Sequence, residues 1–438
     1  MPMFGYYFKL GLRSLRRNRA LTALMVLTLA VGVAASVSTL TILHMMSGDP
    51  IPEKSKRLLV PQVDNGPLDG WSPGDEPNDV QMSYQDAANL LKSGQGERRT
   101  ALFGVAGPLE PPRKDLPAFM VSGMAPTRDF FAMFNVRFLH GQAWSEADDA
   151  RGADVVVLGR AMAEKLFGKA DPVGRQVRLM GFPFTVSGVI DTWNPRPRYY
   201  KLVGGDTFGD ADDYFIPFST AIRHESDNNG GMSCTSRRDP GYAALLASEC
   251  TWIQFWFETR AVSDRADLQA WLDNYVRDQK KLGRFKRTAP NHLYHVMEWM
   301  DVLKIVDNDS KLSVWLAFGF LALCLVNTIG LLLAKFSVRA SEIGVRRALG
   351  ASRREIFRQF LVETGVIGLA GGLLGLGLAF GALALIGMQG TEVAAMAHMD
   401  WQMLGLTFVL SVAAALLAGL LPTWRACQVT PAIQLKSQ

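Results

Sequence analysis

Residues 335–363 read KFSVRASEIGVRRALGASRREIFRQFLVE, and the cationic part of this stretch, 335–355, lies between two apolar runs. The run before it covers 312–334 and reads LSVWLAFGFLALCLVNTIGLLLA. The run after it covers 356–387 and contains LVETGVIGLAGGLLGLGLAFGALALIG. Each run is long enough to cross a lipid bilayer as a helix, so the sequence excludes a wholly soluble protein.

Two further apolar runs complete the membrane part of the chain. One covers 21–46, contains no Asp, Glu, Lys or Arg, and would be roughly 39 Å long as a helix. The other covers 403–421. A cleaved signal peptide is an alternative for 21–46, but the run is too long and no small-residue cleavage site follows it. We therefore predict an integral membrane α-helical protein with four transmembrane helices, arranged as one plus three.

The distribution of Lys and Arg predicts how these spans are oriented. Basic side chains occur in 1–20, in 335–355 and in 422–438, whereas the short loop 388–402 contains neither Lys nor Arg. By the positive-inside rule, both termini and the loop 335–355 lie in the cytoplasm. The long segment 47–311 then lies on the other side of the membrane.

The charge balance agrees with this orientation. Residues 51–310 carry 31 basic and 35 acidic side chains, and the rest of the chain carries 15 basic and 6 acidic ones. The overall net charge of +5 therefore comes from the segments predicted to be cytoplasmic. It is a signal of membrane orientation, and it gives no indication that the chain binds nucleic acid.

The segment 47–311 is long enough to form a large extracytoplasmic domain with its own core. It mixes strand and helix patterns, which predicts a mixed α+β fold with two lobes. The expected elements are a helix with Ser83 as its N-cap, strands at 118–123, 154–158 and 252–260, helices at 160–167 and 267–280, and a hairpin of 177–179 with 184–189 closed by 180–183.

Two of the four cysteines, Cys234 and Cys250, fall in this external segment. In an oxidising compartment they could form a disulfide that closes a loop of about 15 residues and contributes about 3 kcal/mol. The sequence leaves a pair of free thiols equally open.

The spacing of His292, His295 and Glu298 raises the question of a metal site. A zinc site would need further ligands that the sequence does not locate, so a polar helix face leading into the second span is the favoured interpretation. Gly168-Lys169 lacks the upstream Gly and the following Ser or Thr of a Walker A loop. We therefore expect that the chain does not bind ATP through such a loop.

Within the cationic stretch, the sequence predicts a short helix, a sharp turn and a long helix. Residues 341–349 are helical in character, Gly350 is placed for a left-handed C-terminal cap, and Ser352 with Glu355 forms a capping box. The short helix carries small, apolar and cationic groups, which suit a knob seated in a groove of another protein. Binding of membrane lipids with anionic headgroups explains the same arginines equally well.

A family resemblance favours the first interpretation. Residues 342–351, EIGVRRALGA, resemble the R-E-I-G-x-R-x-A-x-G-A stretch of MacB/FtsX-type ABC transporter permeases, with Arg339 displaced from the family's usual position. Residues 360–363, FLVE, match the family's following F-L-x-E. Parts of 155–189 resemble the MacB-type periplasmic core, and 421–435 resembles the family's C-terminal motif, with Thr replacing its usual acidic residue.

The resemblance implies a permease of the mechanotransmission type in a bacterial inner membrane, with several spans and cytoplasmic termini. In that family, the loop is a coupling helix that contacts an ABC ATPase subunit. The matching coupling residues are Glu342, Ile343, Gly344, Arg346, Arg347, Ala348, Leu349 and Gly350. We expect no catalytic residue and no cofactor in this chain, because ATP and Mg²⁺ would be bound by an ATPase dimer supplied in trans. A second permease, identical or homologous, would pair with this one.

Polar residues inside the predicted spans are candidates for contacts between helices. Asn327 and Thr328 could hydrogen-bond across helices. Glu363 should be costly in a membrane unless it is paired, and Arg358 or Arg347 is its expected partner.

Small residues and an amphipathic terminus add two further expectations. Pairs such as Gly371/Gly375 and Gly377/Gly381 allow close helix packing, either within one permease or between two. Residues 3–19 resemble an amphipathic helix that lies along the cytoplasmic membrane surface.

Two functions stay open on the sequence alone. The first is export or efflux of a drug, peptide or lipid-linked substrate, with MacB relatives working through a periplasmic adaptor and an outer-membrane channel. The alternative is an FtsX-like signalling or scaffold permease that activates a periplasmic cell-wall hydrolase without transport. The large external domain favours export. An enzyme merely anchored to the membrane is disfavoured, because no nucleophile or metal motif is present.

Overall fold

The computed structural model describes residues 18–75, 80–113, 115–204, 207–234, 237–288, 290–339, 342, 345–346, 349–388 and 401–427. The chain divides into two compact units. Gly48–Ile305 forms the extracytoplasmic unit, and Met1–Ser47 together with Val306–Gln438 forms the helical unit. The extracytoplasmic unit begins one residue later and ends six residues earlier than the predicted 47–311. The predicted amphipathic helix at 3–19 lies almost wholly outside the described residues.

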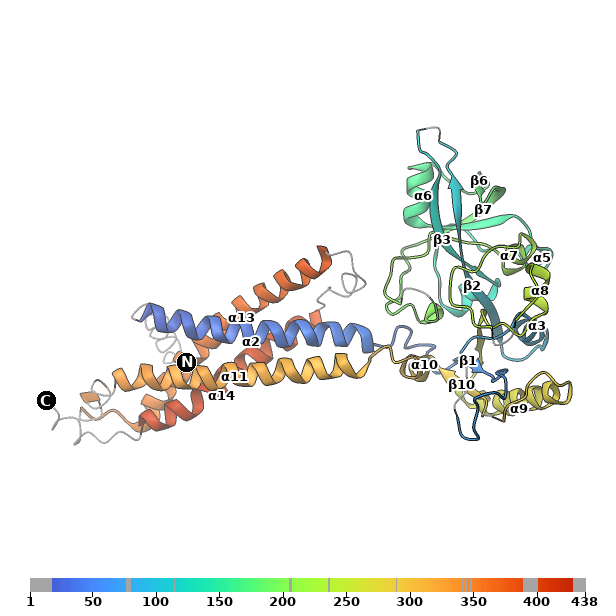
Figure 1. The fold of residues 1–438 in the computed structure, drawn as a ribbon. Coiled ribbons are helices and arrows are strands. Elements are labelled where there is room, and N and C mark those ends of the chain that lie inside the picture. Colours follow the sequence, from blue (N-terminus) through green and yellow to red (C-terminus); the bar gives the residue numbers. More distant parts are fainter. Residues whose placement is uncertain are drawn as a thin grey trace. The chain divides into compact units, whose positions relative to one another are not determined.

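The helical unit contains four long helices in its described part (Figure 1): α2 (Arg19–Ser47), α11 (Asn308–Val338), α13 (Arg353–Met388) and α14 (Trp401–Cys427). The first three are long and apolar enough to cross a membrane. In α14 the apolar part, Phe408–Trp424, is shorter and does not reach the length of such a span. Three candidate spans are therefore established, and the fourth stays a prediction.

The helices of this unit pack around α2 and α13. α2 contacts both α11 and α13, and α14 contacts α13 and α11. The buried residues of the main cluster come from α2, α11 and α13: Met25, Leu29, Leu332, Phe336, Ile356, Phe360 and Ile367. Many apolar side chains on the outer side of α11, including Trp315 and Val326, are exposed. Such a surface suits contact with lipid.

Glycines explain how closely α2 and α13 approach. A Cβ atom added at Gly375 would lie 2.9 Å from the carbonyl oxygen of Ala30 and 3.2 Å from Cβ of Val33, both on α2. A Cβ at Gly371 would lie 3.0 Å from Cβ of Leu29. This small-residue pair therefore serves packing within one chain. Gly377 has open space beside it, with no described atom within 4 Å of such a Cβ.

The extracytoplasmic unit mixes strands and helices, as the sequence predicts. Its strands are β1 (Leu58–Gln62), β2 (Arg98–Glu110), β3 (Phe119–Pro126), β4 (Phe138–Gly141), β5 (Val155–Gly159), β6 (Gln176–Leu179), β7 (Phe182–Ile190), β8 (Tyr214–Phe215), β9 (Gln254–Glu258) and β10 (His292–His295). Its helices are α3 (Tyr84–Lys92), α4 (Asp129–Met133), α5 (Glu146–Arg151), α6 (Arg160–Phe167), α7 (Phe218–Arg223), α8 (Tyr242–Ala247), α9 (Arg265–Lys281) and α10 (Val296–Val302), with 3-10 turns at Tyr199–Lys201 and Val262–Asp264.

All of these strands join one sheet in the order β10-β1-β9-β2-β3-β8-β5-β7-β4, with β6 paired to β2 and β7. The first four strands form an antiparallel block built from β1-α3-β2 and β9-α9-β10. This is the β-α-β-β-α-β arrangement of ferredoxin-like folds. We call this block the split half, because the chain from β3 to α8 is inserted between its two βα units.

The inserted half contains β3 to β8 and α4 to α8. The long strand β2 belongs to both halves, because its first residues, Arg98–Leu102, pair with β9 while Leu102–Leu109 pairs with β3. One strand therefore connects the two halves rigidly. The two lobes expected from the sequence are in fact two parts of one continuous sheet.

Alternate residues of the strands point to opposite faces of this sheet and fill two separate cores. Phe255 and Phe257 of β9 lie in one cluster, which is covered by α3 and α9, whereas Trp256 lies in the other. The second cluster is rich in aromatic rings and includes Trp299 of α10. Both faces of β9 are buried, which explains why its three central residues, Phe255, Trp256 and Phe257, are all aromatic.

Most predicted local elements are confirmed. Ser83 caps α3, because its hydroxyl accepts the backbone N–H of Asp86 at 3.2 Å. α6 has the predicted bounds, and β6 and β7 form the predicted hairpin, closed by Met180 and Gly181, which both have positive φ. The prediction for His292 was wrong. It lies in strand β10 and not on a helix, because antiparallel pairing with β1 overrides the local pattern.

Candidate coupling site

The connection between α11 and α13 contains the predicted coupling residues. Glu342, Arg346, Leu349 and Gly350 belong to the described part of the chain, whereas Ile343, Gly344, Arg347 and Ala348 lie outside it.

Gly350 ends the short helix in the way the sequence predicts. Its φ is 98°, a conformation that favours glycine. The backbone N–H of Leu349 bonds to the carbonyl of Val345 at 3.0 Å, and that of Ala351 bonds to the carbonyl of Arg346 at 3.0 Å. The second bond is typical of a Schellman C-cap, which reverses the chain sharply.

The capping box that starts α13 is confirmed as well. The backbone N–H of Ser352 donates to Glu355 Oε2 at 3.0 Å, and the backbone N–H of Glu355 donates to Ser352 Oγ at 3.2 Å. These bonds satisfy N–H groups that the first turn of a helix leaves free. The two caps together fix the geometry of the turn.

The tip of this connection exposes apolar side chains. Leu349 is 82% exposed and Val345 is 56% exposed. Both lie in the stretch that the charge distribution assigns to the aqueous cytoplasmic side. Large apolar side chains clustered on a polar loop suit a protein contact better than solvent.

Arg346 holds the short helix against the start of α13. Its Nη2 lies 2.6 Å from Glu342 Oε1, an ion pair between residues four apart in the chain. Its Nη1 donates to Gln359 Oε1 of α13 at 3.2 Å. Arg346 is thus occupied within the chain on two sides, and it positions the exposed tip.

A buried ion cluster forms the base of the site. Glu363 on α13 is 3% exposed and forms ion pairs with two cations at the end of α11. Lys335 Nζ lies 2.8 Å from Glu363 Oε1, and Arg339 Nη1 lies 3.1 Å from Oε2. The displaced Arg339 therefore has a defined role, because it ties the end of α11 to α13.

The expected pairing of Glu363 with Arg358 was wrong. Five residues along a helix turn a side chain by about 140°, so Arg358 faces away from Glu363 and is exposed. The other expected partner, Arg347, lies outside the described residues. The cations that the structure places on Glu363 come from α11 instead.

Aromatic packing reinforces this base. The rings of Phe336 on α11 and Phe360 on α13 lie 4.5 Å apart between centroids, and both side chains are buried together with Ile356. The site thus combines a rigid, buried base with an exposed apolar tip.

The predicted hydrogen bond of Thr328 across helices was wrong, and the one predicted for Asn327 stays a prediction. The hydroxyl of Thr328 donates to the carbonyl of Cys324 at 2.8 Å, one turn earlier on its own helix. A Ser or Thr hydroxyl inside a helix often forms this hydrogen bond with the carbonyl four residues earlier. Asn327 is exposed on α11. Its amide has no hydrogen-bond partner among the described residues, so the structure leaves it available to another chain.

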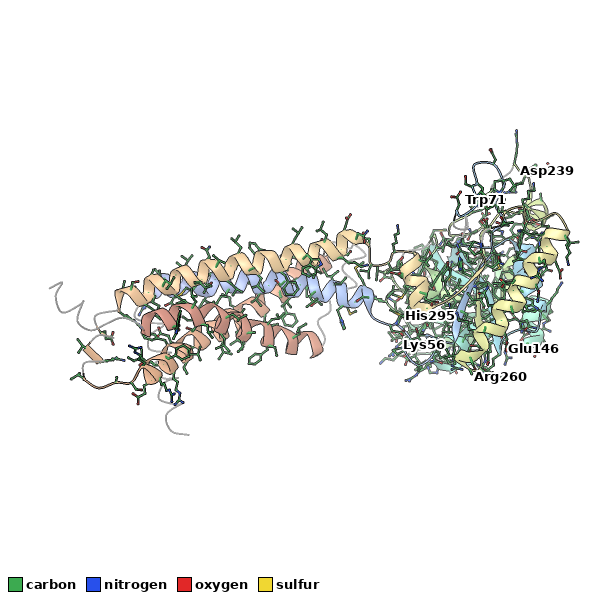
Figure 2. The ribbon with its side chains drawn as sticks, turned by 90° about the horizontal axis from the view of Figure 1, so that it is seen from below. Lys56, Trp71, Glu146, Asp239, Arg260 and His295 are labelled. Carbon is green, nitrogen blue, oxygen red and sulfur yellow. A yellow bond between two sulfur atoms is a disulfide. The ribbon has the colours of Figure 1, made fainter. Side chains whose placement is uncertain are left out.

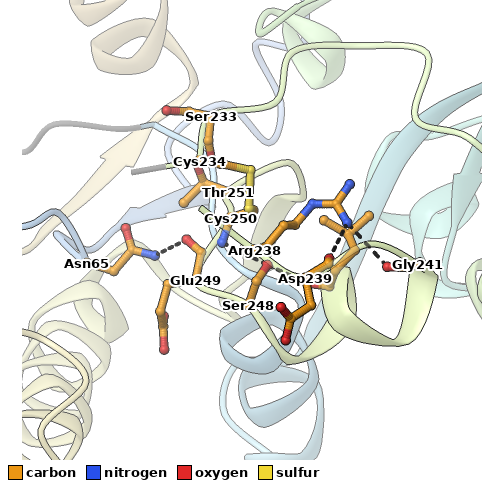
Figure 3. The surroundings of a disulfide bond; sticks show 11 residues. Asn65, Ser233, Cys234, Arg238, Asp239, Gly241, Ser248, Glu249, Cys250 and Thr251 are labelled. Atoms are coloured by element: carbon orange, nitrogen blue, oxygen red, sulfur yellow. Dashed lines mark hydrogen bonds between the residues drawn. A yellow bond between two sulfur atoms is a disulfide. The ribbon is translucent and has the colours of Figure 1, made fainter. Parts of the chain in front are cut away.

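Cys234 and Cys250 are bonded to each other in the extracytoplasmic unit (Figure 3). The backbones beside them also pair, because Ser233 and Thr251 exchange N–H to carbonyl bonds of 2.9 Å and 2.8 Å. The disulfide thus closes a loop whose two ends already meet. The sequence had left this pairing open.

The metal interpretation finds no support in the described residues. No group of three or more His, Cys, Asp or Glu side chains there is placed to hold an ion. His295 instead caps α10, because its Nδ1 accepts the backbone N–H of Glu298 at 3.3 Å. Glu298 in turn pairs with Arg265 at 2.7 Å.

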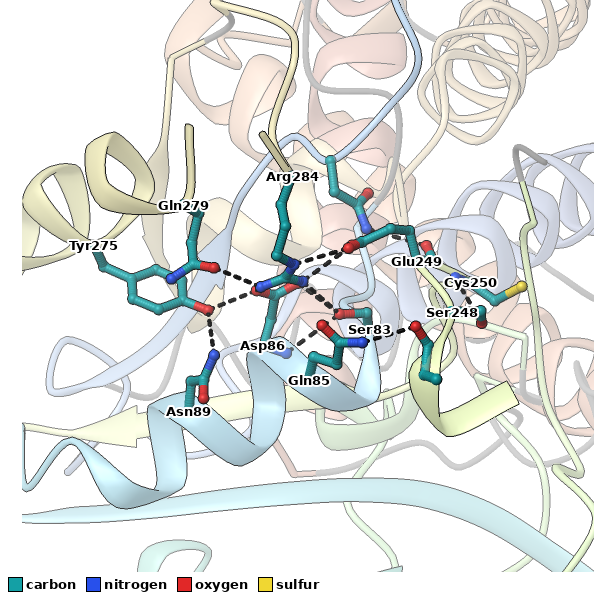
Figure 4. Close-up of polar contacts among 12 residues, drawn as sticks. Ser83, Gln85, Asp86, Asn89, Ser248, Glu249, Cys250, Tyr275, Gln279 and Arg284 are labelled. Carbon is teal, nitrogen blue, oxygen red and sulfur yellow. Dashed lines mark hydrogen bonds and ion pairs between the residues drawn. The ribbon is translucent and has the colours of Figure 1, made fainter. Parts of the chain in front are cut away.

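Among the described residues, three ion clusters around the buried carboxylates of Asp86, Glu258 and Asp212 were not predicted from the sequence. In the first, Arg284 contacts Asp86 and Glu249, and the hydroxyl of Tyr275 donates to Asp86 at 2.6 Å (Figure 4). This cluster connects α3, α9 and the segment beside the disulfide. Its members lie far apart in sequence and follow no spacing pattern, so no sequence signal could have identified it.

The second cluster surrounds Glu258 at the end of β9, whose side chain is buried. Lys54 Nζ lies 3.0 Å from Oε1, and Arg98 Nη1 lies 3.0 Å from Oε2. Lys54 follows the end of α2 by only seven residues. The backbone N–H of Val296 also bonds to the carbonyl of Ser55 at 3.2 Å. The segment after the first span and the segment before the second therefore meet inside this unit.

The third cluster surrounds Asp212. Arg198 Nη2 lies 2.6 Å and Lys201 Nζ lies 3.2 Å from Oδ1, while the hydroxyl of Tyr200 donates to Oδ2 at 2.8 Å. All four side chains are buried. Two cations share one carboxylate here, and the cluster anchors the chain between β7 and β8.

Two protein families match this chain. The MacB-like periplasmic core domain family matches residues 22–275, and the FtsX-like permease C-terminal family matches residues 314–431. The first match spans α2 and most of the extracytoplasmic unit. The second covers the coupling site and the helices around it.

Individual proteins are similar over most of the chain. The pyoverdine export ATP-binding/permease protein PvdT of Pseudomonas fluorescens is 27% identical over 432 residues, which are 96% of this chain and 58% of that protein. The macrolide export ATP-binding/permease protein MacB of Azoarcus sp. is 29% identical over 309 residues, 68% of this chain and 40% of that protein. The chain thus spans only about half the length of these relatives.

Solved structures also align with the chain. The periplasmic region of MacB from Actinobacillus actinomycetemcomitans is 15% identical, with a TM-score of 0.36, over 59% of this chain and 96% of that one. The extracellular domain of the noncanonic ABC-type transporter YknZ from Gram-positive bacteria is 12% identical, with a TM-score of 0.35, over 54% of this chain and 100% of that one.

Proposed function

The chain belongs to the MacB/FtsX-type permeases of ABC transporters, and from this membership we propose that it relays ATP-driven motion of a nucleotide-binding subunit to its extracytoplasmic unit. The relatives PvdT and MacB are named as export proteins. Export of a small molecule, peptide or lipid-linked compound is therefore the function that we propose. Their names do not favour the signalling alternative.

The observation that carries this proposal is the form of the coupling site. Its exposed tip, with Val345 and Leu349, offers an apolar knob to a partner. Its base, with Glu363 between two cations, joins the tip firmly to α11 and α13. A push on the tip would therefore move both helices together instead of bending the loop. In this proposal, ATP and Mg²⁺ are bound by the partner ATPase, and this chain supplies the mechanical contact.

The extracytoplasmic unit is suited to receive such motion. The chain enters it shortly before β1 and leaves it shortly after β10, and these two strands are paired, with Val60 opposite Tyr294. The Ser55–Val296 bond joins the two connecting segments as well. A shift between the first and second spans would therefore act on one paired edge of the sheet.

The membrane part supports pairing with a second permease. Asn327 exposes an amide on the outer face of α11, and beside it a Cβ added at Gly330 would meet no described atom within 4 Å. An amide facing hydrocarbon is unfavourable unless another helix supplies a partner. We propose that a second permease, identical or homologous, covers this face, with both termini of each chain in the cytoplasm of a bacterial inner membrane. A periplasmic adaptor and an outer-membrane channel complete the proposed export route.

The coupling proposal is tested by exchanging the charges at the tip. Glu342→Lys together with Arg346→Glu keeps the internal ion pair, so the short helix should persist while its outward charges are reversed. We expect this variant, and Leu349→Asp, to insert in the membrane but to lose co-purification with the ATPase subunit. Lys169→Glu, a comparable charge change in the extracytoplasmic unit, should retain it. Normal ATPase recovery with both tip variants would contradict the proposal.

A further inference from the structure

A cleft of about 920 Å³ lies in the extracytoplasmic unit where the split half and the inserted half meet. One set of its lining residues belongs to α3 and includes Ala88. Another set belongs to α5 and α7 and includes Ala150 and Ile222. Figure 1 shows these three helices on the same side of the unit. The volume lies in the range of small-molecule pockets, which occur preferentially where two parts of a protein meet.

The cleft offers an apolar surface to a ligand. The rings of Tyr84 and Phe218 stack with centroids 6.3 Å apart, and both line the cleft. Leu91 of α3 and Ile222 of α7 extend this surface on the two sides. The body of a bound molecule could therefore rest on side chains from both halves.

Two acidic side chains of the cleft are already engaged by the protein. Asp149 accepts the indole N–H of Trp144 at 3.0 Å and the backbone N–H of Arg128 at 2.9 Å. Asp129 accepts the backbone N–H of Arg99 at 3.2 Å. These carboxylates therefore have structural partners and are not placed to receive a ligand cation.

Two of the cations that line the cleft are engaged as well. The side chain of Arg99 donates to the carbonyls of Leu91 and Gln95 at 2.7 Å and 2.9 Å and so caps the end of α3. Arg223 pairs with Asp154 and also donates to a backbone carbonyl at 3.0 Å. Neither guanidinium is available to a ligand without losing these bonds.

Two other cations of the cleft are not engaged. Among the described residues, the side chains of Lys92 and Arg128 have neither a hydrogen bond nor an ion pair, and both are exposed. The third acid of the cleft, Glu146, lies in the first turn of α5, where the helix dipole stabilises a negative charge (Figure 2). The cleft therefore combines an apolar surface with two exposed cations that form no hydrogen bond or ion pair with the described residues.

We propose that this cleft binds an amphipathic organic anion, with its apolar body against Tyr84 and Phe218 and its acidic group at Lys92 and Arg128. Cationic donors form strong hydrogen bonds with carboxylates, and binding here would break none of the protein's own pairs. The proposal goes beyond the relay function, since it depends neither on the ATPase nor on transport.

The test uses 2-naphthylacetate as the anionic probe and its neutral amide as the matched compound. The full chain is placed in lipid nanodiscs without any ATPase, and binding is followed by ligand-observed NMR against empty nanodiscs. We expect the carboxylate to bind more tightly than the amide. Lys92→Gln together with Arg128→Gln should weaken the carboxylate at least about tenfold, which corresponds to the loss of one or two charge-assisted bonds, and should leave the amide unchanged.

Two single substitutions sharpen this test. Lys169→Gln removes an exposed cation outside the cleft and should not change binding. Ala150→Trp fills space in the cleft and should weaken both compounds. Equal affinity for carboxylate and amide, or unchanged affinity in either cleft variant, would overturn the proposal. Because no ATPase is present, these results are independent of the coupling experiment.

Discussion

Glu363 shows how much a single charge can matter inside the membrane part. Its carboxylate is buried between Lys335 and Arg339, so Glu363→Gln would remove the negative charge that these two cations share. Loss of one member of a buried ion pair typically costs about 3–5 kcal/mol. We expect a clear drop in the melting temperature of the detergent-solubilised chain, followed by tryptophan fluorescence.

Glu342→Gln is the matched control for this prediction. Glu342 also pairs with an arginine, but that pair is partly exposed and joins residues four apart in the chain. Such pairs contribute only about 0.2–0.5 kcal/mol, so the melting temperature should hardly change. Equal melting temperatures for the wild type and Glu363→Gln would show that the ion cluster does not stabilise the base.

The buried carboxylate of Asp212 leads to a prediction of how folding stability changes at acidic pH. Burial alone would raise the pKa of Asp212, but the charges of Lys201 and Arg198 and their hydrogen bonds outweigh burial, and the pKa of Asp212 lies below its usual value. The cluster therefore stabilises the fold above the unfolded pKa of about 3.9, and this contribution is lost as the pH falls through the lower folded pKa. Asp212→Asn should lower stability at pH 7 by about 3–5 kcal/mol and should flatten the pH dependence below about pH 4.

Urea unfolding at several pH values measures this effect. Asp171→Asn is the control, because Asp171 is exposed and its side chain accepts a hydrogen bond from the backbone N–H of Val173 and has no ion pair among the described residues. Parallel stability curves for the wild type and Asp212→Asn across the acid range would contradict the role of this carboxylate.

Residues that act locally were predictable from the sequence, and those that act at long range were not. Ser83, Gly350 and the pair of Ser352 with Glu355 lie where a helix begins or ends, and capping depends on neighbours within a few residues. The cations beside Glu363 come from the end of another helix, α11, and no local pattern around Glu363 identifies them. The clusters of Asp86, Glu258 and Asp212 could not be found, because the sequence does not show which distant charges meet.

Helix contacts give a prediction with a built-in control. Gly375→Leu would push a side chain into Ala30 and Val33 of α2, whereas Gly377→Leu would enter open space. Overpacking of this kind typically costs about 1–3 kcal/mol. We expect Gly375→Leu to lower thermal stability and Gly377→Leu to leave it nearly unchanged. The reverse ranking would show that α2 and α13 do not pack in this way.

The disulfide gives a second prediction for a structural element. Cys234→Ser together with Cys250→Ser opens a loop of about 15 residues, which should cost about 3 kcal/mol. Urea unfolding of the extracytoplasmic unit within the full chain measures this difference. Wild type and variant should converge when a reductant is added. Equal stability without reductant would mean that the bridge adds nothing to the paired backbones of Ser233 and Thr251.

Helices and hairpins were easier to predict than strand order. The periodicity of α6 and α9 and the turn between β6 and β7 are visible within a dozen residues. β10 was mistaken for a helix because it is only four residues long and its identity depends on β1. The order of strands in the sheet follows from tertiary packing, which no local pattern encodes.

The orientation of the whole chain is tested by labelling. After Cys324 and Cys427 are replaced by Ala, a cysteine introduced by Leu349→Cys should resist a membrane-impermeant maleimide in intact cells and react once the inner membrane is permeabilised. A cysteine introduced by Lys169→Cys should react in cells whose outer membrane alone is opened, because the positive-inside rule places it outside. Labelling of the Leu349 position in intact cells would overturn the coupling proposal.

The global plan was predictable only in outline. Long apolar runs and the distribution of basic residues indicated several spans around one large external domain. The division of the sheet into a split half and an inserted half was not predicted. Its key pairs join residues such as Val60 and Tyr294, which are separated by most of the domain's length.

The split architecture has a consequence for biosynthesis. β9 pairs with both β1 and β2, for example with Glu258 opposite Arg98, but it lies much later in the chain. When β1 and β2 emerge from the translocation channel, β9 has therefore not yet been made. The strands of the inserted half can pair with one another first, while the backbone N–H and C=O groups of β1 still lack their strand partners. Such edges invite aggregation in a nascent chain. Periplasmic chaperones would therefore be needed most in the interval before β9 and β10 arrive, and slow secretion should lengthen that vulnerable period.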